Sequence, residues 1–191
     1  PTLVNNVETL SCVPHIVLNG PEWFASIGTE KSAGPKMFCI SGHVNKPGNY
    51  ELPLGTTLRE LIYDHAGGVK DSKKIKAIIP GGASTSLLTE EHLDVPLAFE
   101  TLVEKGSSLG TGAVIVMDED TDIVHAMLIM ARFFAHESCG RCGPCRVGTR
   151  EMVRLMELFD AGEGTPHDLE LLRTICEQIP GKTFCPLGEA S

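Results

Sequence analysis

The sequence lacks three features, and each absence excludes a class of protein. None of its 191 residues lies in an apolar run long enough to cross a bilayer, so we expect no direct membrane insertion. Positive charge is scarce, because 16 lysines and arginines face 25 aspartates and glutamates, and the net charge of −9 would repel nucleic acid. No secretory signal is visible, and seven cysteines make an odd number, which disfavours a disulfide framework in a secreted protein.

What the chain does have is a group of cysteines at ligand spacing. Cys139, Cys142 and Cys145 form a Cys-x-x-Cys-x-x-Cys run, and Cys185 follows much later in the chain. Three thiolates separated by two residues each converge only around something that they hold together. Four cysteine sulfurs are the ligand set of a [4Fe–4S] cluster, which would make this an electron-transfer protein in a reducing compartment.

A structural zinc site is the main alternative to the cluster. Zinc also takes four cysteines, but its usual pattern is two separated Cys-x-x-Cys pairs. Three closely spaced cysteines followed by a distant one fit that pattern poorly. A zinc-stabilised interaction domain therefore remains as an alternative, and a disulfide framework is a weaker one.

Two cysteines compete for the role of fourth ligand. Cys176 lies among Leu169, Leu172 and Ile179, whose helical spacing predicts one apolar face, where a cysteine is usually a small buried hydrophobe. Cys185 instead follows a Pro-Gly-Lys break and precedes a proline, which predicts a loop that opens a helix. We therefore assign Cys185 as the ligand. The thiols expected to be ordinary and buried are Cys12, Cys39 and Cys176.

The chain divides into three predicted parts. In residues 1–35, a helix-like stretch from Val7 to Leu18 is interrupted by Pro14 and followed by a loop. Residues 36–118 have the pattern of a small α+β domain. Strands are predicted at 37–41, 50–52, 75–79 and 113–117, and a capping box at Thr57 opens a helix that a glycine pair closes. A hairpin, a crossing helix and further strands are the order of a β-grasp sheet.

Residues 119–191 are predicted to be helical. A nearly continuous apolar stretch from Ile123 to Phe134 follows a cap at Asp120 or Thr121 and suits a helix buried inside a bundle. A second helix is predicted from Pro144 to Gly162, a third behind a Thr165 cap, and a fourth from Pro186. Four short helices with short loops predict a four-helix bundle.

Two longer motifs resemble a known family. Glu137-Ser-Cys-Gly-x-Cys-x-Pro-Cys-Arg-x-Gly148, with the distant Thr-x-Cys-x-Leu-Gly, resembles the cluster domain of the flavin-bearing, NADH-oxidising subunit of respiratory complex I. The opening Pro1-Thr-Leu-Val-Asn-Asn-Val-Glu-Thr-Leu10 resembles the stretch that ends the flavin domain of that subunit. The middle of the chain resembles its soluble-ligand-binding β-grasp domain.

The resemblance implies a specific activity. Members of this family oxidise NADH with FMN, which then passes single electrons to the [4Fe–4S] cluster and on to further clusters and quinone. Val4, Asn5 and Asn6 would line the flavin, although an Asn-Asn pair alone more often marks a turn or a cap. Related subunits serve NAD-linked hydrogenases and formate dehydrogenases, so the final acceptor stays open.

The implied partners are the other subunits of an NADH dehydrogenase, including a thioredoxin-like iron–sulfur subunit and a larger iron–sulfur subunit. The implied place is the cytoplasmic or mitochondrial-matrix side of an energy-conserving membrane, as a peripheral subunit. The glycine-rich nucleotide-binding segment of the family does not occur in these residues and should precede Pro1. We therefore expect the 191-residue chain alone not to oxidise NADH. A small-ligand sensor that binds at Gly81-Gly82 is a third interpretation.

Overall fold

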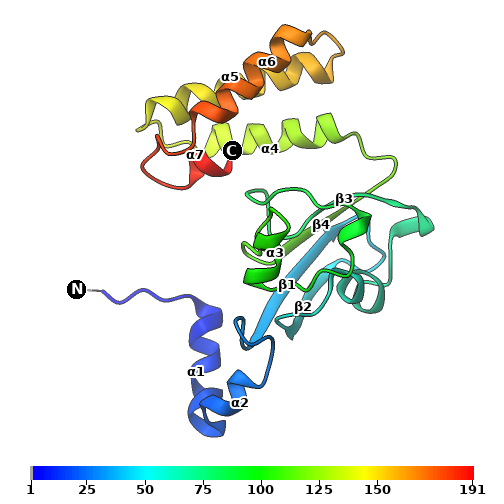
Figure 1. The fold of residues 1–191 in the computed structure, drawn as a ribbon, viewed down its shortest axis with the longest axis vertical. Coiled ribbons are helices and arrows are strands. Elements are labelled where there is room, and N and C mark those ends of the chain that lie inside the picture. Colours follow the sequence, from blue (N-terminus) through cyan, green and yellow to red (C-terminus); the bar gives the residue numbers. More distant parts are fainter. Residues whose placement is uncertain (1) are drawn as a thin grey trace. The chain divides into compact units, whose positions relative to one another are not determined.

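The computed structural model describes residues 2–191, and it divides the chain into two compact units that adjoin in sequence between Asp120 and Thr121 (Figure 1). The first unit holds a mixed sheet with helices, and the second is helical. Within the described residues, no helix combines the length and the apolar character needed to span a membrane.

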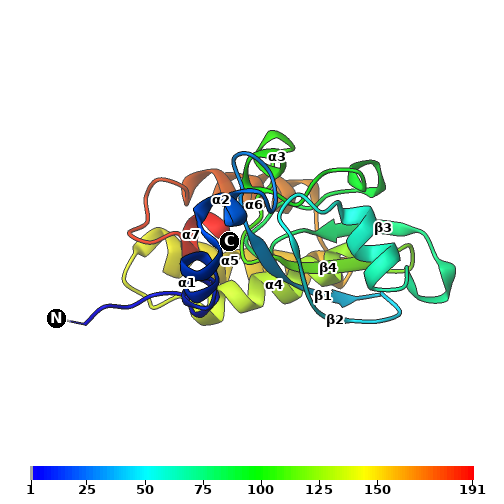
Figure 2. The same ribbon diagram turned by 90° about the horizontal axis from the view of Figure 1, so that it is seen from below.

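The first unit begins with two helices and continues as a four-stranded sheet with short helical connections (Figure 2). Its elements are α1 (Val7–Asn19), α2 (Pro21–Ala25), β1 (Pro35–Gly42), β2 (Gly48–Pro53), η1 (Glu60–His65), η2 (Lys70–Ser72), β3 (Ile75–Ile79), η3 (Glu90–His92), α3 (Phe99–Glu104) and β4 (Ala113–Asp118). The four strands lie where the sequence predicted them: β3 has the predicted bounds, and the other three are slightly longer.

The sheet has the order β2-β1-β4-β3. β1 pairs antiparallel with β2 and parallel with β4, and β3 pairs antiparallel with β4. Side chains alternate along β1, so that Phe38 and Ile40 are buried while Met37 and Cys39 are exposed. The buried face packs on residues from η1 and the long connections, which together form the core of this unit.

One local prediction for the first unit needs correction, and another is confirmed. Pro14 does not interrupt α1, which runs through it. Proline lacks the N–H that would bond to the carbonyl of Leu10, but α1 has no buried residue, so water can satisfy that carbonyl. The helix after Thr57 has the predicted capping box, because Thr57 N–H donates to Glu60 Oε2 at 2.8 Å and Glu60 N–H donates to Thr57 Oγ1 at 3.1 Å. It then widens into a π-helix, η1.

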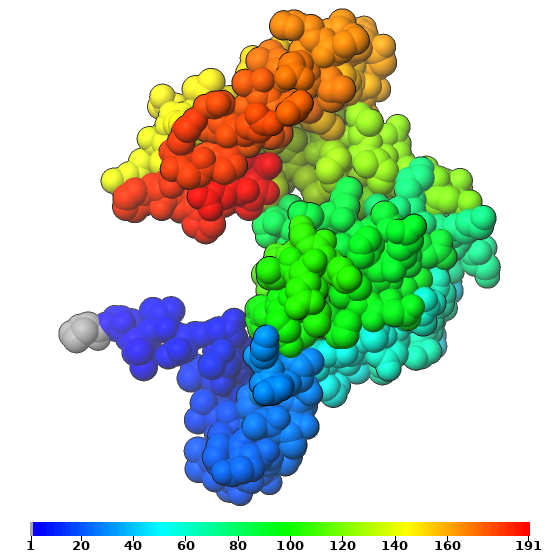
Figure 3. All heavy atoms as spheres, in the orientation of Figure 1, coloured from blue at the N-terminus to red at the C-terminus, as the bar shows by residue number. Residues whose placement is uncertain are grey.

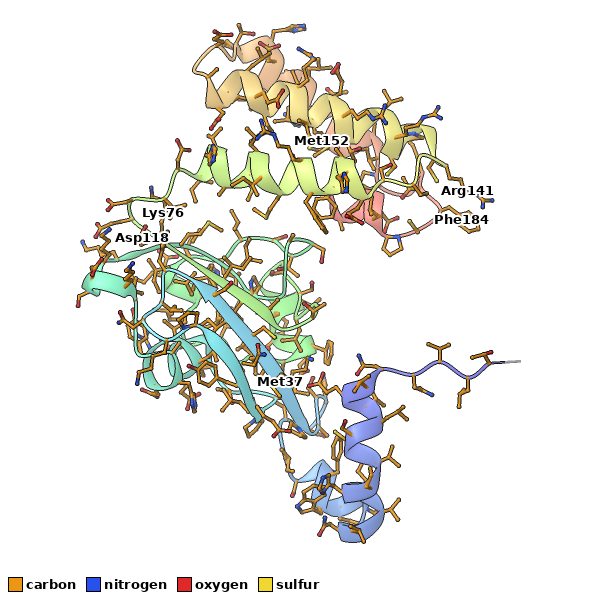
Figure 4. All side chains as sticks on the ribbon, turned by 180° about the vertical axis from the view of Figure 1, so that it is seen from behind. Met37, Lys76, Asp118, Arg141, Met152 and Phe184 are labelled. Atoms are coloured by element: carbon orange, nitrogen blue, oxygen red, sulfur yellow. The ribbon has the colours of Figure 1, made fainter. Side chains whose placement is uncertain are left out.

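One carboxylate joins the N-terminal helices to the sheet. Glu8 on α1 accepts hydrogen bonds from the ammonium of Lys36 and the N–H of Met37 on β1, and Figure 4 labels Met37. Partial burial opposes ionisation, but the Lys36 and Met37 donors outweigh it and hold the pKa of Glu8 below its ordinary value.

The short helix η2 contains two residues with an unusual backbone conformation. Asp71 and Ser72 both have positive φ, 55° and 54°, although neither is glycine.

The second unit consists of α4 (Ile123–Glu137), α5 (Gly143–Asp160), α6 (Pro166–Gln178) and α7 (Leu187–Ala190). α5 contacts each of the other three helices and so forms the centre of the unit. Its buried side chains include Met152, labelled in Figure 4, and Leu155, and α4 contributes Leu128 and Phe134. These residues recur at helical spacing, which places them on the facing sides of two amphipathic helices.

The expectation of a helix buried inside a bundle holds for one face of α4 only. Ile129 is 55% exposed and Phe133 is 51% exposed, so α4 buries one face only within this unit. Its cap is Asp122, whose carboxylate accepts from the N–H of Val124 at 2.9 Å, and not Asp120 or Thr121. The predicted Thr165 cap of α6 is confirmed, since Thr165 and Asp168 bond reciprocally.

Candidate iron–sulfur site

The first three cysteines lie on the loop between α4 and α5 and on the first turn of α5. Ser138 ends α4, and Gly140 turns the chain with φ of 79°, a conformation that side chains with a Cβ rarely adopt. Cys142 is the N-cap of α5, and Pro144 occupies the start of the helix, where a missing N–H costs nothing. Local sequence therefore builds a sharp turn that ends at a helix N-terminus.

The three thiols of this loop differ in exposure. Cys145 is 7% exposed, and its Sγ lies 3.3 Å from the hydroxyl of Ser138. Its carbonyl accepts from Thr149 Oγ1 at 2.7 Å, so the residue is held on both sides. Cys142 is half-buried and Cys139 is exposed. The innermost thiol is thus fixed by the helix, and the outermost one faces solvent.

Cys185 lies on the loop that joins α6 to α7, and this loop adjoins the first one. The N–H of Phe184 donates to Cys142 Sγ at 3.3 Å. Figure 3 shows the segments near residues 140 and 185 side by side on the surface of the helical unit. Cys185 itself is exposed. The structure therefore brings the loop of the predicted fourth ligand to the loop of the first three.

The Cys185 loop is fixed at its base by Ile179, which is 3% exposed. A Cβ on Gly148 of α5 would lie 2.7 Å from Ile179 Cδ1, and one on Gly188 of α7 would lie 3.1 Å from Ile179 Cγ2. Ile179 thus fills the space beside Gly148, and it shares the space beside Gly188 with Thr183, whose Cγ2 would lie 2.6 Å from a Cβ there. These are the glycines that end the two halves of the motif, and their small size lets α5, α7 and the loop approach closely.

Cys176 is placed differently from the four proposed ligands. It lies on α6 and is exposed, and partial desolvation of its sulfur raises the pKa of the Cys176 thiol. The expectation of buried thiols is wrong in detail, because Cys39 is exposed on the outward face of β1 and Cys12 is only half-buried. α6 contains no buried residue, which explains Cys176.

The four sulfurs do not yet converge as ligands. Across residues 2–191, no three cysteine, histidine, aspartate or glutamate side chains lie close enough together to hold a metal ion. The outer two cysteines, Cys139 and Cys185, are exposed, so no packing opposes rotation of their side chains. Four thiols on two adjoining loops, with a backbone N–H aimed at one sulfur, are a donor set that fits a [4Fe–4S] cluster.

The predicted flavin contacts lie in the other unit, at its N-terminal end. Val4 is 83% exposed and Asn5 is exposed, both in extended chain before α1. Asn6 is the N-cap of α1, and its Oδ1 accepts from the N–H of Thr9 at 3.1 Å. The capping role anticipated for an Asn-Asn pair is thus present. The assignment of these residues to FMN stays a prediction.

A hollow beside α1 was not anticipated from the sequence. It has a volume of about 890 Å³ and lies between α1, α2 and the β1–β2 edge of the sheet. Its walls are formed by Asn6, Val7, Glu8, Ser11, Cys12, His15, Trp23, Phe24, Ile27, Pro35, Met37, Glu51, Leu52 and Pro53. The walls of the hollow come from segments that are separate in the sequence. The single tryptophan and its apolar neighbours were the only sequence signal for this hollow.

The Gly81-Gly82 loop offers no backbone cradle at Gly81. The N–H of Gly81 donates to Thr85 Oγ1 at 3.2 Å, and its carbonyl accepts from the N–H of Thr111 at 3.0 Å. A Cβ at Gly81 would lie 2.2 Å from the carbonyl oxygen of Leu109. Close approach of two chain segments accounts for this glycine, so the sensor interpretation gains no support here.

Two family models match the chain, each over a different range of residues. Residues 125–191 match the NADH-ubiquinone oxidoreductase-F iron-sulfur binding region, and residues 36–125 match the SLBB domain. The matches meet at residue 125, close to the division between the two units. The first family thus covers all four candidate ligand cysteines.

Whole-chain relatives have a consistent name. An NADH-quinone oxidoreductase F subunit (the one numbered 2) of Rhizobium meliloti (strain 1021) is 49% identical over 191 residues, which are 100% of this chain and 45% of that protein. The F subunit of Mycobacterium tuberculosis (strain ATCC 25618 / H37Rv) is 49% identical and covered to 43%. That of Escherichia coli (strain K12) is 48% identical over 97% of this chain and covered to 42%. The chain spans less than half the length of these relatives.

A solved structure has the same fold. The crystal structure of an NAD+-reducing [NiFe]-hydrogenase in the air-oxidized state matches with a TM-score of 0.88 at 42% identity, over 100% of this chain and 32% of that chain. The H2-reduced state of that enzyme matches with a TM-score of 0.87 at the same identity.

Proposed function

The chain belongs to the family of the NADH-quinone oxidoreductase F subunits, and on this premise we propose that it is the electron-transfer segment of such a subunit. Electrons from NADH would reach it through FMN and leave it singly for further clusters and quinone. The observation that carries the proposal is the hydrogen bond from the Phe184 N–H to Cys142 Sγ, because it joins the loops of all four proposed ligands.

The cofactor that fits the donor set is a [4Fe–4S] cluster, which would take up and release one electron at a time. Cys139, Cys142, Cys145 and Cys185 would hold it. Gly140 lets the first loop turn sharply, and the N-terminus of α5 directs backbone N–H groups toward the cysteine loop. Those amides and the nearby Arg141 and Arg146 offset negative charge at the site in a chain of net charge −9.

We further propose a role for each part of the chain. The parallel β1–β4 pair flanked by antiparallel strands supports a β-grasp domain over residues 36–118. The packing of α5 against α4, α6 and α7 supports a four-helix-bundle iron–sulfur domain over residues 119–191. Residues 1–35 would be the end of the FMN- and NADH-binding domain and a linker, with Val4, Asn5 and Asn6 directed to the flavin. The exposed apolar side chains of α1, such as Val7 and Leu10, support burial of that helix in a larger protein.

The partners that we propose are other subunits of an NADH dehydrogenase, among them a thioredoxin-like and a larger iron–sulfur subunit. The subunit would be peripheral, on the cytoplasmic or mitochondrial-matrix side of an energy-conserving membrane. A second candidate is the corresponding subunit of an NAD-linked hydrogenase, which is favoured by the 42% identity to the NAD+-reducing [NiFe]-hydrogenase. The higher identities to the F subunits, 48–49%, favour the first candidate.

The test of the proposal is the metal content of matched cysteine variants. After anaerobic purification, the wild-type chain should contain iron and acid-labile sulfide and absorb broadly in the visible range. Cys185→Ser should lose most of the iron, whereas Cys176→Ser should retain it, because Cys176 lies on α6 and not on the loop that Phe184 joins to Cys142. A colourless wild-type protein that contains zinc would contradict the proposal and favour a zinc-stabilised interaction domain. Iron loss in Cys176→Ser alone would reverse the ligand assignment.

A further inference from the structure

Phe184 and Arg141 form a contact between the two cysteine loops. The guanidinium carbon of Arg141 lies 4.9 Å from the centroid of the Phe184 ring, and Figure 4 shows the two labelled side chains next to one another. Phe184 is 82% exposed, so the ring has almost no core packing to hold it. A cation within about 6 Å of an aromatic face is attracted by the ring quadrupole. The cation–π contact therefore links the Phe184 ring to the first cysteine loop.

The backbone of the same phenylalanine contacts a proposed ligand. Its N–H donates to Cys142 Sγ at 3.3 Å, and the next residue along the chain is Cys185. Ring, amide and fourth thiol are thus carried by two consecutive residues. The contact with Arg141 therefore adds a second link between this two-residue segment and the first cysteine loop, beside the hydrogen bond to Cys142.

We propose that Arg141 is a positioning residue, which acts through the ring of Phe184 to keep the amide of Phe184 bonded to Cys142 Sγ and Cys185 within reach of the other three thiols. This inference rests on the proposed cluster. Hydrogen bonds to the sulfurs of an iron–sulfur site raise its reduction potential, because they stabilise the added negative charge of the reduced form. Arg141 would therefore raise the potential and slow the release of iron by placing a neutral amide, in addition to any effect of its own charge.

The rival explanation is that Arg141 acts by charge alone. A positive charge close to the site also stabilises the reduced form, and it needs no aromatic partner. The two explanations differ in what they expect of Phe184. Phe184→Leu keeps the backbone N–H, every charge and most of the apolar volume, and it removes only the aromatic face that Arg141 contacts.

The experiment compares Arg141→Gln, Phe184→Leu, the double variant and Phe184→Trp in the full anaerobically prepared chain. We expect Arg141→Gln and Phe184→Leu each to lower the equilibrium constant for one-electron reduction by about threefold to tenfold, which is about 28 to 59 mV at 59 mV per tenfold change. The double variant should fall little further than Arg141→Gln, because both changes break one interaction. Phe184→Trp, which keeps an aromatic face, should stay near the wild type.

Two measurements test the positioning role of Arg141. A redox titration followed by low-temperature EPR gives the potential, and the rate of bleaching by an iron chelator should rise about twofold to fivefold in the two single variants. A wild-type potential and bleaching rate in Phe184→Leu would overturn the inference, as would additive effects in the double variant. A wild-type chain without iron would instead remove the proposed function itself, so the two failures are distinguishable.

Discussion

At the scale of single residues, the start of α6 shows how two side chains satisfy a helix end. Thr165 Oγ1 accepts from the N–H of Asp168 at 3.3 Å, and Asp168 Oδ2 accepts from the N–H of Thr165 at 2.9 Å. The hydroxyl of Thr165, and then its N–H, hold the pKa of the Asp168 carboxyl below its ordinary value of 3.8. The ionised carboxylate is therefore the form that stabilises the folded helix.

This cap predicts a defined response to acid. Because the folded pKa of Asp168 is depressed, its contribution to stability is complete above pH 3.8 and is lost as the pH falls through the lower folded value. Thr165→Ala should lower the free energy of unfolding by about 1 kcal/mol near neutral pH. Asp168→Asn should be destabilised near neutral pH and lose less further stability in acid than the wild type. Urea unfolding followed by circular dichroism at several pH values measures both, and an unchanged acid response in Asp168→Asn would contradict the assignment.

Residues in local motifs were predictable, and residues that depend on distant partners were not. The Thr165 and Thr57 caps are each encoded within four residues, and both form as predicted. The exposure of Cys39 depends on which face of the sheet receives the core, and the sequence around it does not decide that. The hydrogen bond from Phe184 to Cys142 joins residues far apart in the chain, so only the structure could find it.

At the scale of elements, Ile179 determines how closely α5, α7 and the Cys185 loop approach. Gly148→Ala would gain about 1 kcal/mol of helix propensity but would place a methyl 2.7 Å from Ile179 Cδ1. Overpacking of a filled core costs about 1–3 kcal/mol, so we expect a net destabilisation of up to about 2 kcal/mol. The displaced isoleucine should also loosen the Cys185 loop and speed the loss of iron to a chelator.

A second substitution tests this explanation directly. Ile179→Val removes Cδ1, the atom that a Gly148 side chain would meet, and by itself should cost about 1 kcal/mol. Combined with Gly148→Ala, it should cost clearly less than the sum of the two single changes, because the new methyl fills the space that Cδ1 leaves. Simple additivity in thermal unfolding would show that the two positions do not compete for one space.

Elements were predictable where a periodic pattern extends over several residues. The four strands and α5 and α6 follow such patterns, and each lies within a few residues of its expected position. The exposed face of α4 could not be predicted, because its apolar residues continue around the helix and periodicity alone cannot say which of them a neighbour covers. The π-helix η1 and the passage of α1 through Pro14 have no sequence signature, since each depends on how surrounding groups satisfy the altered backbone.

At the scale of the whole molecule, the division after Asp120 separates the proposed ligands from the sheet. All four proposed ligand cysteines lie between residues 139 and 185, within the second unit. Ligands that a metal centre joins favour the folded state of the unit that carries them. We therefore expect iron loading to slow amide hydrogen exchange in α5, α6 and the cysteine loops by about tenfold or more, and to change exchange in β1–β4 little.

The comparison uses the iron-loaded chain and the same chain after anaerobic chelation, with peptide-resolved hydrogen exchange. Cys185→Ser serves as a matched control, because its amide hydrogen exchange in α5, α6 and the cysteine loops should already be fast without added chelator. Equal protection of both units by iron would contradict ligation confined to the second unit.

The domain order and the ligand set could be proposed from the sequence because cysteine spacing is a local and specific signal. The surroundings of Val4, Asn5 and Asn6 could not be derived in this way. Two of them lie in extended chain with exposed side chains, and nothing in residues 2–191 places a nucleotide-binding loop beside them. The hollow beside α1 likewise depends on segments that meet only in the folded chain.

Two consecutive residues at η2 with left-handed backbone conformations are candidate positions for changing the thermal stability of the protein. Asp71 and Ser72 each adopt a backbone conformation that glycine reaches without steric penalty and that other L-residues adopt at a cost of about 1 kcal/mol. Glycine also has more freedom to lose on folding, so only one of the two positions is a sensible target. Because η2 lies in the first unit, before β3, and the proposed ligands all lie in the second, we expect a glycine substitution at η2 to leave the proposed ligand cysteines unchanged.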